Sequence, residues 1–282
     1  MTNRILIIGA SGFIGNTIYK ELRPYFDVYG TYCTQEETFS DNQVFYAFNA
    51  ENDTIVEILK EVQPDVIISC FKATADKHIQ THKLLCDYVW ASNTKLLFVS
   101  SASVFDAKNK FPAYEHDVPS SQSNDGKQKI AVEKLIQHLP ELNYLIVRLP
   151  LILGVNSPSI IQLKQAIKHH ASFEVFPNIV VSASTADKVA QQIHYLVNKQ
   201  LAGIFHLASN DVSHHDDLFK EISEKLSEKK PIFTNAYQSN DDEYLAILSK
   251  ENSLPKNYQI TLAEIIADSS LQEEIITLKN SI

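Results

Sequence analysis

Glycine, cysteine and long apolar runs are all scarce in this chain of 282 residues. The spacing of the three cysteines, Cys33, Cys70 and Cys86, is not that of a metal-binding motif. Free thiols are therefore favoured over a metal or redox site. No apolar run approaches membrane-spanning length and no signal peptide is visible, so we expect a cytoplasmic protein. The net charge of −9, without a basic block, argues against a nucleic-acid partner. What remains is an ordinary globular composition, with 44% hydrophobic and 21% charged residues.

Three of the seven glycines fall within one short stretch, Gly9-Ala10-Ser11-Gly12-Phe13-Ile14-Gly15. An apolar run typical of a buried strand precedes it, and an apolar stripe at helical spacing follows it. In this context Gly9 permits a tight turn, Gly12 leaves room for a pyrophosphate, and Gly15 lets the helix pack close to the sheet. Free N–H groups at the helix start then face the phosphates. The stretch predicts a dinucleotide-binding turn; the alternative is a plain glycine turn.

The first half of the chain alternates strand and helix signals. Strands are expected at 5–9, 27–32, 44–48, 65–69, 96–100 and 144–148, with helices at 13–23, 53–62, 77–92 and 126–138 between them. This alternation predicts an α/β fold, a Rossmann-type doubly wound parallel sheet covered on both faces. Ligands in such folds bind beyond the carboxyl ends of the strands.

After residue 148 the alternation of strand and helix signals becomes less regular. We predict a dinucleotide-binding Rossmann domain over 1–155 and a smaller C-terminal substrate domain over 156–282. The segment 184–208, with a helix capped by Ser184 or Thr185, is expected to pack back onto the first sheet. A cleft between the two parts is the expected substrate site.

Further motifs follow the later strands. Ser101 comes at the end of the fifth strand, four residues before Phe105 in the run 104–106, Val-Phe-Asp. The segment 71–77 follows the fourth strand, and Lys129 lies in the helix after the fifth. Together with the glycine turn, these motifs make the chain resemble an extended short-chain dehydrogenase/reductase of the dTDP-4-dehydrorhamnose reductase branch. It is also similar to a non-catalytic relative of that branch, the regulatory β subunit of methionine adenosyltransferase.

The resemblance implies an NAD or NADP cofactor and a Ser/Thr–Tyr–Lys catalytic set. Ser101 would bind the substrate carbonyl, and Lys129 would bind the nicotinamide ribose and lower the pKa of a tyrosine. The cofactor-binding residues that it implies are Gly9, Ser11, Gly12, Phe13, Ile14, Gly15, Tyr32, Asn49, Ala50, Cys70, Phe71, Lys72 and Lys129. The substrate-binding residues are Ser101, Ala102 and Leu151, and no metal is expected.

One departure from the family pattern concerns the general acid, which is the tyrosine of the catalytic set. Asp125 stands where the tyrosine of Tyr-x-x-x-Lys belongs, four residues before Lys129. A phenol, with pKa ≈ 10, can donate a proton at neutral pH, whereas an aspartate, near 4, is already ionised. Losing a general acid typically costs ~10²–10⁴ in rate, so ketone reduction is expected to be impaired. Tyr114 or His116, on the intervening loop, could substitute, although an ordinary loop role is favoured for each.

Other departures concern specificity. After the second strand stand Tyr32, Cys33 and Thr34, with neither the acid that favours NAD nor the arginine that favours NADP. Asn49 replaces an aspartate near the adenine and can still hydrogen-bond there. In the substrate region Ala102 replaces an aspartate and Leu151 a tryptophan, which weakens the prediction of a dTDP-sugar.

Two functions from different classes therefore follow from the sequence. One is a reductase of a 4-keto sugar nucleotide with impaired catalysis, acting on a small-molecule substrate. The other is a cofactor-binding regulatory or scaffold protein without turnover, which would act through a protein partner or as a homo-oligomer. An epimerase or dehydratase is a third option that also needs the missing phenol.

Overall fold

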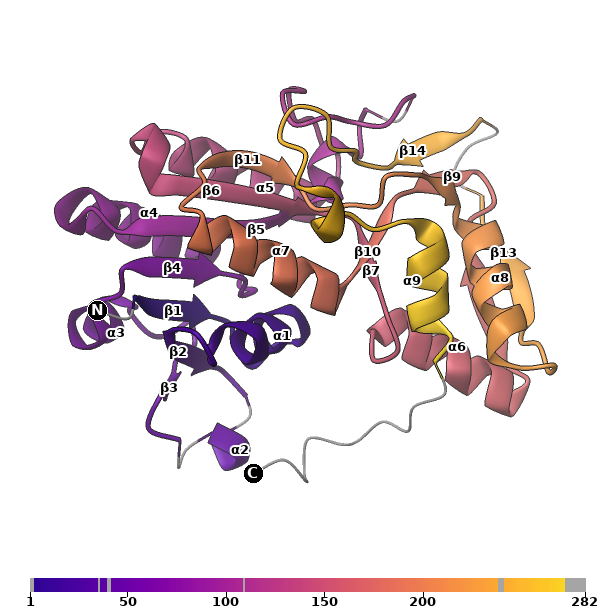
Figure 1. Ribbon diagram of the computed structural model, residues 1–282, viewed down its shortest axis with the longest axis horizontal. Coiled ribbons are helices and arrows are strands. Elements are labelled where there is room, and N and C mark those ends of the chain that lie inside the picture. Colours follow the sequence, from indigo (N-terminus) through magenta and orange to yellow (C-terminus); the bar gives the residue numbers. More distant parts are fainter. Residues whose placement is uncertain (1–2, 35, 40–41, 109, 238–240, 272–282) are drawn as a thin grey trace.

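The computed structural model describes residues 3–271 except 35, 40–41, 109 and 238–240 (Figure 1). Its centre is a seven-stranded sheet in the order β11-β6-β5-β4-β1-β2-β3, and every neighbouring pair is parallel. Its strands are β1 (Arg4–Ile8), β2 (Asp27–Tyr32), β3 (Phe45–Ala47), β4 (Val66–Ser69), β5 (Lys95–Ser101), β6 (Tyr144–Leu149) and β11 (Gly203–His206). The predicted fold class, a Rossmann-type parallel sheet, is confirmed.

The strand order reverses beside β1. From β1 the chain first runs outward through β2 and β3, then returns to β4 on the other side and continues to β5 and β6. A crevice forms at such a reversal because the two connections leave the strand ends in opposite directions. The glycine turn follows β1 and Cys70 follows β4, so both lie at this crevice.

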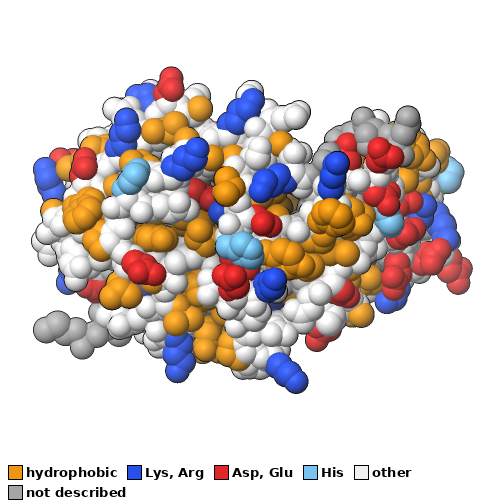
Figure 2. Space-filling view, turned by 90° about the horizontal axis from the view of Figure 1, so that it is seen from above, with side chains coloured by type: hydrophobic (Ala, Val, Ile, Leu, Met, Phe, Trp, Pro, Cys, Tyr) orange, Lys and Arg blue, Asp and Glu red, His pale blue; other side chains and the backbone are white. Residues whose placement is uncertain are grey.

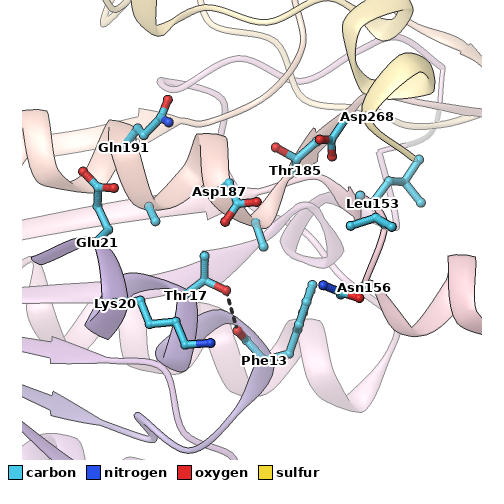
Figure 3. Close-up of a pocket in the computed structure, with 14 residues that line it drawn as sticks. Phe13, Thr17, Lys20, Glu21, Leu153, Asn156, Thr185, Asp187, Gln191 and Asp268 are labelled. Atoms are coloured by element: carbon cyan, nitrogen blue, oxygen red, sulfur yellow. Dashed lines mark hydrogen bonds between the residues drawn. The ribbon is translucent and has the colours of Figure 1, made fainter. Parts of the chain in front are cut away.

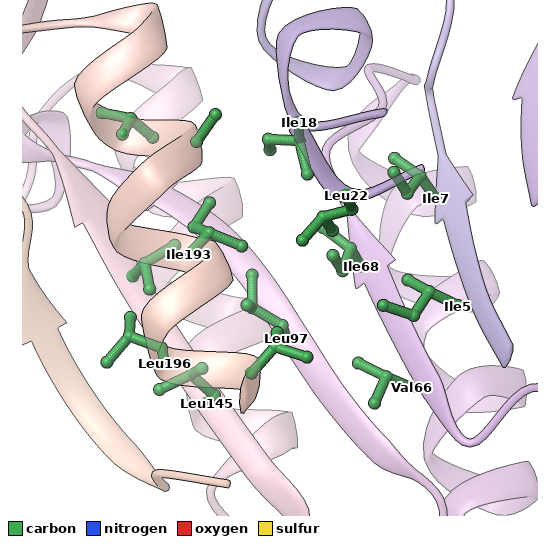
Figure 4. Packing of buried hydrophobic residues seen from close by; sticks show 14 of the residues in the cluster. Ile5, Ile7, Ile18, Leu22, Val66, Ile68, Leu97, Leu145, Ile193 and Leu196 are labelled. Atoms are coloured by element: carbon green, nitrogen blue, oxygen red, sulfur yellow. The ribbon is translucent and has the colours of Figure 1, made fainter. Parts of the chain in front are cut away.

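Helices cover both faces of the sheet (Figure 1). On one face α1 (Phe13–Leu22) packs against α7 (Ala186–Asn198), and their apolar side chains meet those of β1, β4 and β5 (Figure 4). On the other face lie α3 (Val56–Val62), α4 (Ala75–Ser92) and α5 (Asn124–Ile136). Strand residues that are fully buried, such as Ile5 and Leu6, contribute about 1.5–3 kcal/mol each to folding.

A smaller lobe follows β6. It contains α6 (Pro158–His169), α8 (His215–Leu226) and α9 (Leu262–Ser269) around a third apolar cluster. Its strands are short: β7 (Leu151–Leu153) with β10 (Ala183–Thr185), β8 (Ser172–Val175) with β13 (Ile232–Asn235), and β9 (Ile179–Val181) between β12 (Ser213–His214) and β14 (Glu243–Leu245). The remaining elements are α2 (Glu36–Phe39) and three 3₁₀ turns, η1 (Ala102–Phe105), η2 (Glu141–Asn143) and η3 (Lys256–Tyr258).

The segment 184–208 contributes to the large sheet. Its strand β11 pairs with β6 at the sheet edge, and α7 covers β1 and β5 on one face. Thr185 caps α7 by accepting a hydrogen bond from the Lys188 N–H, as its sequence predicts. The division of the chain at residue 155 remains a prediction.

The surface carries charges of both signs. Figure 2 shows Lys and Arg interspersed with Asp and Glu on the face seen from above, without one continuous basic field there. Of the described helices, none is both long and apolar enough to cross a membrane.

Candidate functional site

The glycine turn brings the end of β1 against the end of β4. Gly9 has φ +90°, a conformation that side chains other than glycine rarely adopt. A Cβ on Gly9 would lie 2.9 Å from the Cys70 carbonyl oxygen and 2.9 Å from the Phe71 nitrogen. The Gly9 N–H donates to Thr31 Oγ1 at 2.9 Å, and the Gly12 N–H donates to the Gly9 oxygen at 3.1 Å. These contacts fix the turn between three adjacent strands.

Helix α1 begins without a side-chain cap. Its N-cap residue, Gly12, offers no side-chain acceptor, and its first turn contains no acid. Side chains cap α5, α6, α7 and α9, namely Ser123, Ser157, Thr185 and Thr261, whereas α3, α4 and α8 begin without a side-chain cap, as α1 does. The first N–H groups of α1 therefore remain available to an anion, which the helix dipole also favours.

A cavity of about 550 Å³, here called the turn cavity, opens over this helix start. It is lined by Gly9, Ser11, Gly12, Phe13, Ile14, Gly15, Thr31, Tyr32, Cys33, Phe48, Asn49, Ala50, Cys70, Phe71, Lys72 and Pro158. Every residue predicted to bind cofactor, apart from Lys129, is among them. The structure thus brings the predicted cofactor-binding residues of four loops together, although Gly9 and Lys72 are 63 positions apart in the sequence.

Replacing Gly15 with alanine is expected to abolish ligand binding in the turn cavity. A Cβ there would lie 2.2 Å from the Gly9 carbonyl oxygen. Because this oxygen belongs to the backbone of the turn, α1 would have to move away from the turn to relieve the clash. We expect at least a ~100-fold loss of dinucleotide affinity by calorimetry. The control is Lys20→Ala, an exposed position near the end of the same helix that lines neither the turn cavity nor the lysine cavity. A Gly15→Ala protein that binds as tightly as the control protein would contradict this account.

A second cavity of about 370 Å³, here called the lysine cavity, adjoins the first. Both are lined by Ile14, Cys70, Phe71 and Lys72. The other residues that line the lysine cavity are Ala73, His78, Val99, Ser100, Ser101, Asp125, Gln128, Lys129, Leu149, Pro150 and Ile152. The two cavities therefore form one site that runs past the carboxyl ends of β2, β1, β4 and β5.

A chain of polar contacts lies in the lysine cavity. Lys129 Nζ donates to Ser101 Oγ at 2.8 Å and to Asp125 Oδ2 at 2.8 Å. Ser103 Oγ donates to the same Asp125 oxygen at 2.7 Å and lies 2.7 Å from Ser101 Oγ. Since the hydrogen of Ser103 is directed at Asp125, the Ser101 hydroxyl donates to Ser103. Ser103 and Lys129 thus both donate to the Asp125 carboxylate, and Ser101 bridges these two donors.

Asp125 is held in its ionised form. Burial raises the pKa of Asp125, but hydrogen bonds from Lys129 and Ser103, with the charges of Lys129 and Lys72, outweigh burial and lower the pKa below its ordinary value. Asp125 is therefore a hydrogen-bond acceptor at neutral pH and has no proton to donate.

The start of α5 is pressed onto η1, which positions this polar chain. A Cβ on Gly126 would lie 2.2 Å from the Ser103 carbonyl oxygen, so only glycine allows the approach. Ser123 caps α5 by accepting from the Gly126 N–H, and Asp106 accepts hydrogen bonds from Ser121 and from the backbone before the helix. Asp125 and Lys129 stand one turn apart on the helix fixed in this way.

His78, on α4, lies in the wall of the lysine cavity although no motif pointed to it. Its ring contacts Phe71 and His82, and its buried Nδ1 has no hydrogen-bond partner within the described part of the chain. Burial, and next the charge of Lys129, lower the pKa of His78 to about 4. The available signal was the i, i+4 pair of His78 and His82 on the apolar face of a helix, which is also typical of a core.

Acidification is expected to destabilise the fold through three buried histidines. Burial lowers the pKa of His78 to about 4, of His82 to about 3 and of His206 to about 4, against 6.5 in the unfolded chain. The unfolded state therefore binds more protons below pH 6.5, so this stability is complete above 6.5 and is lost as the pH falls toward 4. We expect urea unfolding to show a loss of at least ~2 kcal/mol from pH 7 to pH 5.

The matched variant is His82→Leu, which removes one of these titrations and should flatten the decline. A free energy of unfolding that is the same at pH 7 and pH 5 would show that these side chains are not neutral in the fold.

One turn beyond Lys129, α5 is tied to β6 by a buried ion pair. Arg148 Nη2 donates to Glu133 Oε2 at 2.7 Å and Arg148 Nε donates to Glu133 Oε1 at 3.1 Å, while both side chains are no more than 2% exposed. Ser100 also donates to Glu133, and Arg148 donates to the Glu115 carbonyl oxygen and to His206 Nε2. His206 is therefore neutral, with its Nδ1–H donating to the Leu248 carbonyl.

The structure places several predicted residues outside both cavities. Ala102 is buried in a small apolar cluster with Phe105, and Leu151 packs in β7, so neither lines the lysine cavity. Their role in binding substrate remains a prediction. Of the two loop residues that could replace the acid, Tyr114 lies under Lys250 and His116 is 3.3 Å from Glu251, outside the cavity wall.

A third cavity, of about 360 Å³, lies between α1, α7 and the end of α9 (Figure 3). Lys20, Asp187 and Asp268 line it, and Phe13 lines both this cavity and the turn cavity. The hydrogen bond drawn in Figure 3 lies within α1, where Thr17 Oγ1 donates to the Phe13 carbonyl oxygen at 3.0 Å. Apart from Phe13, no predicted site residue lines this cavity, so the candidate site is the pair of turn and lysine cavities. Within the described residues, no group of His, Cys, Asp or Glu is arranged to hold a metal ion.

By its fold the chain is a Rossmann-type α/β protein whose candidate site lies where this class binds nucleotides, at the reversal of strand order. The chain belongs to the family of the RmlD substrate binding domain, whose model matches residues 3–254.

Individual relatives match the chain at low sequence identity. Methionine adenosyltransferase 2 subunit beta of Danio rerio is 24% identical over 237 residues, which cover 74% of this chain and 69% of that protein. The match to the Bos taurus counterpart spans about half of that protein, 47% of its length and 54% of this chain, at 27% identity.

Two solved structures from Bacillus anthracis str. Ames show the same fold. A dTDP-4-dehydrorhamnose reductase in complex with NADP has a TM-score of 0.72 at 18% identity, covering 95% of this chain and 98% of that one. A dTDP-glucose 4,6-dehydratase in complex with NAD has a TM-score of 0.79 at 16% identity, covering 95% of each chain.

Proposed function

We propose that this protein binds a nicotinamide dinucleotide across the turn and lysine cavities. The observation that carries the proposal is the uncapped start of α1 opening into a cavity that continues to the Lys129–Ser101 contact. The N–H groups that follow Gly12 in the first turn of α1 would hold the pyrophosphate, and Lys129 would hold the nicotinamide ribose. NAD and NADP complexes among the structural neighbours support this class of ligand. When bound, the nicotinamide supplies or accepts a hydride.

The substrate that we propose is a 4-keto sugar nucleotide. Ser101 would donate a hydrogen bond to the ketone oxygen, in exchange for its contact with Ser103, and Lys129 would stabilise negative charge that develops on that oxygen. Lys72 lines both cavities and is suited to an anionic phosphate. Membership of the RmlD substrate binding domain family and the reductase among the neighbours support this substrate class.

Catalysis is proposed to be slow because the site has no proton donor matched to the ketone oxygen. The lowered pKa of Asp125 leaves it ionised, and its carboxylate accepts from Lys129 and Ser103. The proton for the reduced oxygen must then come from water or from the ammonium group of Lys129.

A second candidate is a dinucleotide-binding regulatory protein without turnover. The observation that favours it is the Asp125–Lys129 ion pair at 2.8 Å, which engages the lysine without providing an acid. The match to methionine adenosyltransferase 2 subunit beta supports the same reading. Its partner would be another protein or a second copy of the chain.

Cofactor titration followed by a turnover assay separates the two functions. The full chain is titrated with NADH and NADPH, and then cofactor oxidation is followed with a panel of keto-sugar nucleotides. Binding with slow oxidation is the result that we expect, whereas binding without any oxidation favours the regulatory function. Absence of binding to either dinucleotide would refute both.

A further inference from the structure

The end of the turn cavity that would receive the adenosine ribose is formed by β2 and the segment after it. The group that reads the ribose 2′ position in this class of fold lies about 20 residues beyond the glycine turn. In this chain that place is occupied by Tyr32 and Cys33, which line the cavity. Tyr32 is buried, while Cys33 and Thr34 are exposed.

Positive charge is confined to the opposite end of the site. Of the described residues that line the turn cavity, Lys72 alone has a charged side chain. Lys72 also lines the lysine cavity, on the far side of β1 from β2, and its charge acts on Asp125. It therefore serves the pyrophosphate or the substrate and is out of place for a 2′-phosphate.

Negative charge lies next to the ribose end. The short helix α2 follows Cys33 and Thr34, carries the exposed acid Glu37 and contains neither Lys nor Arg. Stacking holds α2 against the end of β2, because the ring of Phe39 lies 5.6 Å from that of Tyr32 and 4.5 Å from that of Phe45. The exposed Glu37 stands on this helix, so its charge stays near the ribose end.

We propose that the site is specific for the 2′-hydroxyl form of the cofactor, NAD(H), over the 2′-phosphorylated form, NADP(H). A 2′-phosphate would enter the ribose end with its dianionic charge unpaired and Glu37 nearby, whereas a hydroxyl needs only hydrogen-bond partners. The backbone of Cys33 and the side-chain amide of Asn49, both of which line the turn cavity, are neutral partners of that kind. This inference rests on the proposed function and adds the cofactor specificity to it.

The test compares the affinities of the full chain for NADH and NADPH by calorimetry. We expect NADH to bind at least ~10-fold more tightly. The Cys33→Arg variant should narrow or invert the ratio by pairing with the 2′-phosphate, and Cys33→Gln, of similar reach but neutral, should leave it unchanged.

A second measurement does not depend on a variant. Adenosine 5′-monophosphate and adenosine 2′,5′-bisphosphate differ only in the 2′-phosphate, and the first should be the tighter competitor of NADH. Equal or tighter binding of NADPH, with the bisphosphate the better competitor, would overturn the specificity and leave dinucleotide binding intact. Failure to bind either dinucleotide would overturn the proposed function itself and the specificity with it.

Discussion

The Asp125→Tyr variant reduces 4-keto sugar nucleotides with NADH ~10²-fold or more faster than the unchanged chain. The reason is that the substitution supplies a proton donor four residues before Lys129, on the same face of α5. The Lys129 cation would lower the pKa of the new phenol toward neutrality, and Ser101 already stands 2.8 Å from Lys129 Nζ. Steady-state kinetics at saturating cofactor measure the gain.

Asp125→Phe is the control for this gain. It also removes the carboxylate and frees Lys129 from its ion pair, yet it carries no acidic proton. The rate of Asp125→Phe should stay near that of the unchanged chain, so the difference between the two variants isolates the hydroxyl. If Asp125→Tyr binds the cofactor but gains no reductase activity, the remaining groups do not form a reductase site and the regulatory function is favoured.

The Arg148→Met variant loses ~3–5 kcal/mol of unfolding free energy. Removing the guanidinium leaves Glu133 buried with its charge unpaired, 1% exposed as a residue, beneath Ser100 and the sheet. The same change withdraws the donor to His206 Nε2 and to the Glu115 carbonyl. Urea denaturation at pH 7 provides the measurement.

Two further variants identify the cause of that loss. In the double variant Glu133→Gln with Arg148→Met no charge remains buried, so a large part of the loss should be recovered. Lys60→Met breaks the exposed pair with Glu57, 3.2 Å long on α3, and should cost no more than ~1 kcal/mol. Equal losses for Arg148→Met and Lys60→Met would contradict a desolvated ion pair.

The sequence predicts the central sheet well because local pattern and burial coincide there. The apolar runs of β1, β4 and β6 are buried on both faces, and the gaps between them suit helices. The smaller lobe is less predictable because its strands are two to four residues long. Pairs such as β7 with β10 join segments about 30 residues apart, so their formation depends on tertiary contacts that local propensity does not encode.

The two cavities also differ in how far the sequence predicts the residues that line them. The glycine turn is a local motif, so its backbone requirement is visible in the letters around Gly9. The wall of the lysine cavity is assembled from β4, α4, β5 and α5, and His78 enters it only through the packing of α4. Substrate roles for Ala102 and Leu151 rest on a family pattern and not on local chemistry, and they remain predictions; the structure packs both residues against apolar clusters.

A crystal structure of the chain grown with excess NADH tests the central claim most directly. The account predicts that the diphosphate lies on the N–H groups at the start of α1, with the adenosine end at Tyr32 and the nicotinamide end at Lys129. A turn cavity without a bound dinucleotide under saturating NADH, or a dinucleotide bound elsewhere, would contradict it.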